Sequence, residues 1–108
     1  MLAQYGAVSE PVARAMAEGA RRVLGCDIAV STTGVAGPDS DDRGNPVGLV
    51  YVAIATEQGA YVRQVRAGSG RERIRTVAAH HAFDLVRRYL TGLLSFEKES
   101  NQGKLPTA

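Results

Sequence analysis

Two long stretches of the chain repeat apolar residues every three or four positions, the spacing of an amphipathic helix. The first spans residues 9–24 and opens with Ser9, Glu10 and Pro11, a capping residue, an acid and a proline that suit a first helical turn. The second spans residues 71–94, with apolar residues from Ile74 onward. We expect each helix to bury one face.

Three shorter apolar stretches lie between the predicted helices, at residues 28–30, 48–56 and 61–66, and are typical of strands. The connection at 57–60 is short and contains a glycine, so the last two strands should form a hairpin. The pattern predicts an α/β fold, with a small mixed sheet that includes the hairpin and with helices packed on it.

The strand at residues 49–54 is almost continuously apolar, which favours burial on both faces. Two helices are few for that task, so we expect exposed strand surface and a homo-oligomer. Residues 1–94 should form the folded domain, and the polar segment 95–108 should be a disordered tail.

The amino-acid composition excludes few classes of protein. The 108 residues carry a formal net charge of +2, which neither requires nor excludes a polyanion, and a nucleic-acid contact is the weakest reading. No apolar run reaches the length of a membrane span. Cys26 is the single cysteine, so an intrachain disulfide is excluded, no metal site is expected, and a reducing cytoplasm is the simplest setting.

The first predicted strand leads into a segment rich in hydroxyls and glycines, Ser31-Thr32-Thr33-Gly34-Val35-Ala36-Gly37-Pro38. Glycine lets the main chain approach a ligand closely, so backbone N–H groups become available as donors. We therefore predict a ligand site at the end of this strand.

Arg71 and Arg75 stand one turn apart at the start of the second predicted helix, where cations oppose the helix dipole unless an anion neutralises them. This arrangement suggests phosphate binding. Pairing with nearby acids is an equally weighted alternative. Those acids are Asp39, Asp41, Asp42 and Glu72.

His80 and Asp84 are four residues apart, so the carboxylate could orient the imidazole. No hydroxyl partner is evident on that helical face, and we favour a structural role for His80 and His81 over a general-base role.

Several segments of the chain resemble the CinA carboxy-terminal domain family, the nicotinamide mononucleotide amidohydrolases. The resemblance covers about residues 5–94, and its most specific parts are the T-G-V-A-G-P and P-V-G-L-V-Y segments. The matching segments are Gly6-Ala7-Val8-Ser9, Val12-Ala13, Met16-Ala17-Glu18-Gly19-Ala20, Thr33-Gly34-Val35-Ala36-Gly37-Pro38, Pro46-Val47-Gly48-Leu49-Val50-Tyr51-Val52-Ala53 and Gly70-Arg71 with Ile74-Arg75.

The resemblance implies a compact domain that hydrolyses the carboxamide of nicotinamide mononucleotide to the acid and ammonia, without metal or cofactor. It places Thr33 in the pocket as the catalytic hydroxyl, Gly34, Val35, Ala36 and Gly37 in the ligand loop, and Arg71 and Arg75 at substrate-binding positions. The family's S-x-T-G-G and Y-S-x-x-x-K segments do not occur in this sequence. We therefore expect a partial family domain, and a noncatalytic nucleotide-binding or assembly module is the alternative.

Overall fold

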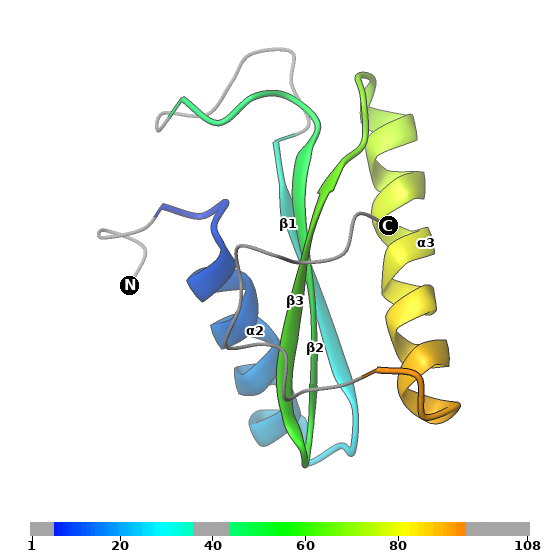
Figure 1. Ribbon diagram of the computed structural model, residues 1–108. Coiled ribbons are helices and arrows are strands. Elements are labelled where there is room, and N and C mark those ends of the chain that lie inside the picture. The colour runs from blue at the N-terminus through cyan, green and yellow to red at the C-terminus, as the bar shows by residue number, and fades with distance from the viewer. Residues whose placement is uncertain (1–5, 36–43, 95–108) are drawn as a thin grey trace.

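The computed structural model describes residues 6–35 and 44–94 (Figure 1). Along the chain the elements are α2 (Glu10–Leu24), β1 (Ala29–Gly34), β2 (Leu49–Thr56), β3 (Gly59–Arg66) and α3 (Arg71–Leu90). The element order and the α/β class predicted from the sequence are confirmed. Ala36 and Gly37 of the ligand segment, and the tail at 95–108, lie outside the described residues.

The three described strands form one sheet in the order β1-β2-β3, and both neighbouring pairs are antiparallel. The expectation of a mixed sheet is therefore wrong for these strands. Parallel neighbours need a long crossover, usually a helix, whereas α2 precedes β1 and α3 follows β3. The predicted hairpin is confirmed: Thr56 pairs with Gly59 across a two-residue turn.

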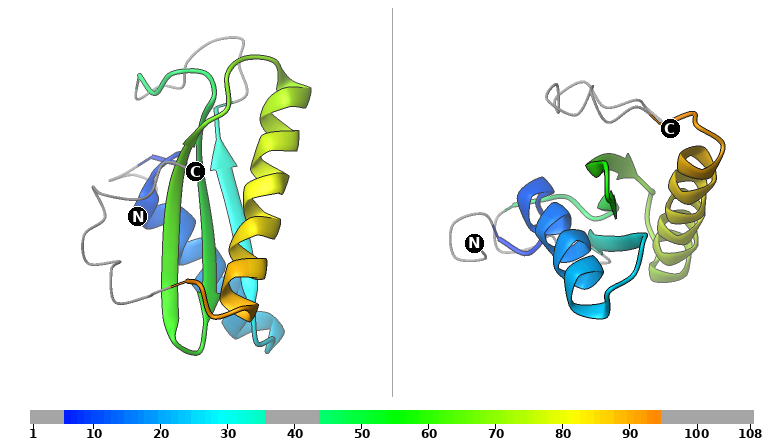
Figure 2. Two further views of the ribbon diagram at one scale, coloured as in Figure 1. Left: turned by 45° about the vertical axis from the view of Figure 1, so that its right-hand side comes forward. Right: turned by 90° about the horizontal axis from the view of Figure 1, so that it is seen from below.

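The two helices lie on opposite faces of the sheet, α2 on one and α3 on the other (Figure 2). Val52, Ala53 and Ile54 in the central strand are fully buried as a result. The expectation that two helices are too few is wrong for β2, because one helix covers each face of it. Exposed apolar side chains lie mostly on the helices, as Val23 and Phe83 show.

The layer between α2 and the sheet is built from small side chains. Its buried members are five alanines and one valine: Ala13, Ala17, Ala53, Ala55, Ala60 and Val62. The Ser31 hydroxyl donates to the Ala13 carbonyl oxygen over 2.7 Å and ties β1 to α2. Small residues bring the helix backbone close to the strands, so this layer has little room for change.

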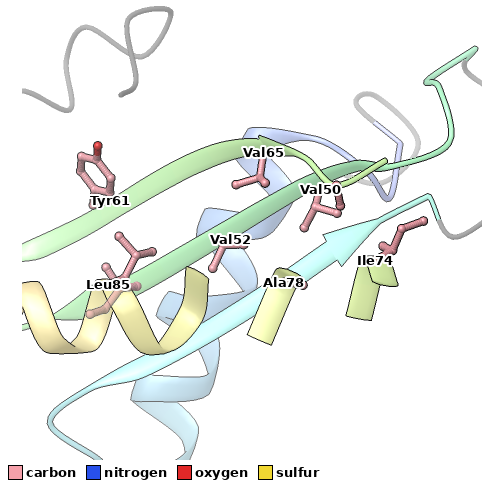
Figure 3. Packing of buried hydrophobic residues seen from close by; sticks show 9 residues of the cluster. Val50, Val52, Tyr61, Val65, Ile74, Ala78 and Leu85 are labelled. Carbon is pink, nitrogen blue, oxygen red and sulfur yellow. The ribbon is translucent and has the colours of Figure 1, made fainter. Parts of the chain in front are cut away.

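The layer between α3 and the sheet uses larger side chains, with Leu85, Ile74 and Ala78 of α3 facing β2 and β3 (Figure 3). Val65 belongs to this layer and Val62 to the opposite one, as the imperfect alternation of this strand predicts. The helix ends at Leu90 rather than at 94, because Gly92 takes a positive φ of 77° and the chain turns there.

The start of α2 differs in one detail from the prediction. Ser9 occupies the N-cap position, but its side chain caps no helical N–H group. Its hydroxyl instead donates to the Gly6 carbonyl oxygen over 3.2 Å. The other end of the helix follows the sequence signal, because Gly25 takes a left-handed φ of 65° and its N–H donates to the Arg21 carbonyl.

Candidate functional site

A groove of about 390 Å³ lies between the end of β1 and the first half of α3. This volume falls within the range of small-molecule sites. The lining residues come from both elements and from β2: Thr32, Thr33, Gly34, Val50, Ile74, Arg75, Ala78 and Ala79. The structure thus brings Thr33, Gly34 and Arg75 together, three of the residues predicted from the sequence.

Thr33 lies near the end of β1, a strand whose side chains alternate between the two faces of the sheet. Its hydroxyl donates to the Ala7 carbonyl oxygen over 2.8 Å, on the face that carries α2. Ser31 points the same way, to Ala13 of α2. By alternation, Thr32 and Gly34 face α3, and Thr32 is the hydroxyl that the sequence reasoning missed, although period-two alternation would have indicated it.

Gly34 leaves the groove open because it has no side chain. A Cβ at this position would lie 2.9 Å from Cγ2 of Val50 and 3.0 Å from the Leu49 carbonyl oxygen. Val35, the next residue of the predicted ligand loop, is buried instead, in a cluster with Val8 and Leu49. Its N–H donates to the Leu49 carbonyl over 3.0 Å, so neither its side chain nor this donor faces the groove.

The predicted pair of arginines divides between two positions. Arg75 lines the groove and also a smaller adjoining hollow of about 320 Å³ with Glu72, Thr76 and Ala79. Arg71 begins α3, one turn away and exposed, and the groove lining does not include it. Gly70 occupies the N-cap position of α3 but has no side chain that could cap the helix. The positive end of the helix dipole therefore lies beside Arg71.

Two further arginines, Arg63 and Arg73, have structural contacts. Arg73 donates from Nε to the Ala67 carbonyl oxygen over 3.0 Å and holds the connection between β3 and α3. Arg63 is almost wholly buried beneath α3. The acids at 39, 41 and 42 lie outside the described residues, so their pairing with arginines stays a prediction.

Arg63 lies at the centre of a charged network between β3 and α3. Its Nη1 donates over 2.9 Å both to Nδ1 of His81 and to Oδ2 of Asp84. Because guanidinium only donates, the Nδ1 of His81 must accept, which makes this imidazole neutral with its proton on Nε2. Asp84 also accepts from Arg87 and Arg88, each over 2.9 Å.

The network explains two pKa shifts. Hydrogen bonds from Arg87, Arg63 and Arg88 hold the pKa of Asp84 well below its ordinary value. Burial lowers the pKa of His81, and the nearby Arg63 and His80 lower it further. Arg63, which pairs with Asp84, contacts His81 rather than His80. The structural role favoured for the histidines from the sequence fits this geometry.

A second polar cluster lies on the α2 face of the sheet, the face to which the Thr33 hydroxyl points. Tyr51 is the cross-strand neighbour of Thr33. Burial raises the pKa of Glu10, which lies 4.0 Å from Arg14, and burial together with the Glu10 charge raises the pKa of Tyr51. The sequence reasoning did not select either residue.

Within ranges 6–35 and 44–94, His, Cys, Asp and Glu side chains form no group of three that could hold a metal ion. Among the same residues, neither helix is both long and apolar enough to cross a membrane.

Known proteins resemble this chain in sequence. The profile of the CinA C-terminal domain matches residues 1–90. A CinA-like protein of Geobacter sulfurreducens is 51% identical over 90 residues, which are 83% of this chain and 22% of that protein. A CinA-like protein of Syntrophomonas wolfei is 48% identical over 89 residues, 82% of this chain and 21% of that protein.

Solved structures agree with the sequence comparison. The competence damage-inducible protein A of Klebsiella pneumoniae superposes with a TM-score of 0.79 at 28% identity, over 83% of this chain and 56% of that one. A competence/damage inducible protein of Agrobacterium tumefaciens gives 0.73 at 36% identity, over 79% and 53%. The chain thus spans about a fifth of the curated relatives and about half of the solved chains, and it belongs to the CinA C-terminal domain family.

Proposed function

We propose that this chain is part of a nicotinamide mononucleotide amidohydrolase and that the groove between β1 and α3 binds the mononucleotide. The observation that carries the proposal is the meeting of Arg75, the glycine of the T-G segment and the main chain of Thr33 in one groove of about 390 Å³. The resemblance to the nicotinamide mononucleotide amidohydrolases suggests the reaction class, and the groove offers a place of suitable size.

Charge and shape support a phosphorylated ligand in this groove. The guanidinium of Arg75 is exposed at the groove and suits bidentate contact with a phosphate. The open main chain at Gly34 and the side chain of Thr32 can donate to, or accept from, a carboxamide. Apolar side chains of Val50, Ile74 and Ala78 offer a surface for a pyridine ring.

The proposed reaction adds water to the carboxamide carbon and breaks the C–N bond, so that ammonia leaves and the carboxylate remains. Such a reaction needs donors for the oxyanion and a group that moves protons. The described lining of the groove contains donors and a cation, but it includes no carboxylate, histidine or lysine. The catalytic role predicted for Thr33 stays a prediction, and its hydroxyl is held by Ala7 on the other face.

The second candidate is a noncatalytic module that binds the mononucleotide without hydrolysing it. The absence of an acid–base group from the described lining of the groove favours it. This alternative keeps the same ligand and the same role for Arg75, so binding and turnover must be measured separately.

Calorimetric titration of the 108-residue chain with nicotinamide mononucleotide, and with the nucleoside that lacks the phosphate, tests the binding step. We expect Arg75→Gln to weaken mononucleotide binding by about tenfold to a hundredfold, because charge-assisted hydrogen bonds contribute about 1.5–3 kcal/mol. Nucleoside binding should be unchanged. Arg22→Gln, an exposed arginine on α2, is the matched control and should alter neither.

Ammonia release tests the chemical step. The suitable enzyme is a chimera in which this chain replaces the matching part of the Agrobacterium tumefaciens protein, since that supplies the remainder of the family domain. Turnover that falls with Arg75→Gln supports the amidohydrolase. Binding without turnover by the chimera would transfer support to the noncatalytic module, and a failure of both proteins to bind the mononucleotide would overturn both candidates.

A further inference from the structure

The smaller hollow beside the groove lies on the first turns of α3, at the end of the sheet where β1 also ends (Figure 1). It is lined by Glu72, Arg75, Thr76 and Ala79, and it shares Arg75 and Ala79 with the groove. These four residues are spaced at i, i+3, i+4 and i+7, so they lie along one side of the helix. A ligand in the groove therefore meets this hollow beyond Arg75.

The groove and the hollow differ in the chemistry of their linings. Apolar side chains such as Val50 and Ile74 form walls of the groove. The hollow instead presents a carboxylate, a guanidinium and a hydroxyl, which belong to Glu72, Arg75 and Thr76. Because Arg75 lines both, it stands at the boundary between them. This order suits a ligand that has an apolar ring at one end and polar groups at the other.

The polar side chains of the hollow are not used by the described part of the fold. Glu72, Arg75 and Thr76 are all exposed. Among the described residues, no side-chain hydrogen bond or ion pair joins any of the three to a neighbour. Glu72 and Arg75 stand three positions apart, a spacing at which opposite charges on a helix can pair, yet they form no such pair. Their polar atoms are therefore available to a ligand.

A mononucleotide offers a different group to each of these side chains. A guanidinium only donates hydrogen bonds and is positively charged, so Arg75 suits the phosphate. A carboxylate only accepts hydrogen bonds and repels a phosphate, so Glu72 suits a hydroxyl donor. The ribose carries two neighbouring hydroxyls, at its 2′ and 3′ positions. In dinucleotide-binding folds an acidic residue accepts from the ribose 2′-hydroxyl in the same manner.

We propose that Glu72 is a specificity-determining residue of the mononucleotide site and that its carboxylate accepts hydrogen bonds from the ribose hydroxyls. The inference rests on the proposed function, because it assigns the hollow to the ribose of the same ligand. It also has a repulsive side. A ligand with a phosphate on its ribose 2′-hydroxyl would bring a second anion against Glu72 and should be rejected. The site therefore selects an unmodified ribose.

Calorimetric titration with nicotinamide mononucleotide and with its 2′-deoxy analogue measures this role as a ratio of two affinities. Both ligands carry the same phosphate, so a change of charge near Arg75 affects them equally and cancels in the ratio. The unaltered chain should bind the mononucleotide about tenfold more tightly than the deoxy analogue, the effect of one charge-assisted hydrogen bond. Glu72→Ala should reduce this ratio to less than about twofold, because the acceptor is gone.

Three further variants separate recognition of the ribose from other effects of charge. Glu72→Gln keeps an acceptor oxygen and should give an intermediate ratio. Glu18→Ala removes an exposed acid of α2, away from the hollow, and should leave the ratio unchanged. Arg75→Gln should weaken the binding of both ligands together and also leave the ratio unchanged, since it acts on the phosphate.

Glu72 also lies in the first turn of α3, where an acid is favourable to the helix dipole. That structural role alone would not distinguish the two ligands. Equal affinities of the unaltered chain for both, or a ratio that survives Glu72→Ala, would overturn this inference and leave the proposed function standing. If neither ligand binds to the chain or to the chimera with the Agrobacterium tumefaciens protein, the proposed function fails, and the assignment of the ribose fails with it.

Discussion

The two faces of the sheet are packed in different ways. On the α2 face, alanines bring helix and strands close together, and Ala13, Ala17 and Ala53 are fully buried. On the α3 face, larger side chains separate the layers, a groove opens beside β1, and the buried Arg63 lies on β3. The strands contribute to this difference as well as the helices, because three of the five buried alanines, Ala53, Ala55 and Ala60, belong to β2 and β3.

The difference follows from side-chain volume. A layer of alanines fixes the distance between helix and sheet and leaves little free space. A layer of larger residues needs complementary shapes along its whole length, and space remains in the groove, whose lining includes Gly34, Ala78 and Ala79. The α2 face therefore serves mainly as a rigid support, and the α3 face carries both the candidate site and the charged network.

Removing the carboxylate from the network is expected to have the largest effect on this comparison. Asp84→Ala leaves the guanidinium of Arg63, whose side chain is only 4% exposed, without its negative partner. Breaking a buried pair in this way costs about 3–5 kcal/mol. Urea unfolding should show this loss of stability, with an unchanged dependence on denaturant concentration.

The matched control removes both charges at once. In the double variant Arg63→Met with Asp84→Ala, no buried charge is left unpaired, so most of the lost stability should return. A single variant that loses less than about 1 kcal/mol would contradict a buried, network-dependent Arg63. In the described residues, Nε of Arg63 is the one buried side-chain nitrogen or oxygen atom without a hydrogen-bond partner. Replacing Arg63 with an apolar residue therefore also removes the free-energy cost of burying that unpaired N–H group.

A pair of enlargements tests the difference in packing directly. Ala17→Leu places a larger side chain in the fully buried alanine layer and should cost about 1–3 kcal/mol in unfolding free energy. Ala79→Leu enlarges an exposed residue that lines the groove, and should change stability by less than about 0.5 kcal/mol. Ala79→Leu should nevertheless weaken mononucleotide binding in the calorimeter, and similar stability losses in both variants would contradict the distinction between the faces.

Much of this fold could be predicted from the sequence because its signals are local. The apolar period of 3.6 located both helices, although the prediction carried the second one past the turn at Gly92 to residue 94. The turn between β2 and β3 followed from four residues, and the opposite directions of Val62 and Val65 followed from strand alternation. Each of these features depends on neighbours within a few positions.

The parts that escaped prediction depend on distant residues. Arg63 could not be separated from the exposed arginines, because its partners His81 and Asp84 lie 18 and 21 positions away. The absence of Arg71 from the groove lining depends on how α3 lies across β1. The side-chain direction of Thr33 is different, since alternation from Ser31 would have indicated it once the face of α2 was known.

The smallest expected effect is the pH dependence of the α3 face. His81 must be neutral to accept from Arg63, and its pKa is lowered from the ordinary value of 6.5, first by burial and then by Arg63 and His80, while Asp84 acts in the opposite direction. Stability is therefore full above pH 6.5 and falls as the pH drops below it, because the unfolded chain takes up this proton first. One proton limits the slope to about 1.4 kcal/mol per pH unit. The Asp84 carboxylate affects stability in a separate pH range, below its ordinary pKa of 3.8, because its pKa is also lowered.

Urea unfolding between pH 7 and pH 5 should show the loss of stability that His81 causes. His81→Gln, whose side chain can still accept from Arg63, should reduce this loss. His80→Gln, which changes an exposed residue, should keep most of it. A slope that is the same in all three proteins would mean that protonation of His81 does not disturb its contact with Arg63.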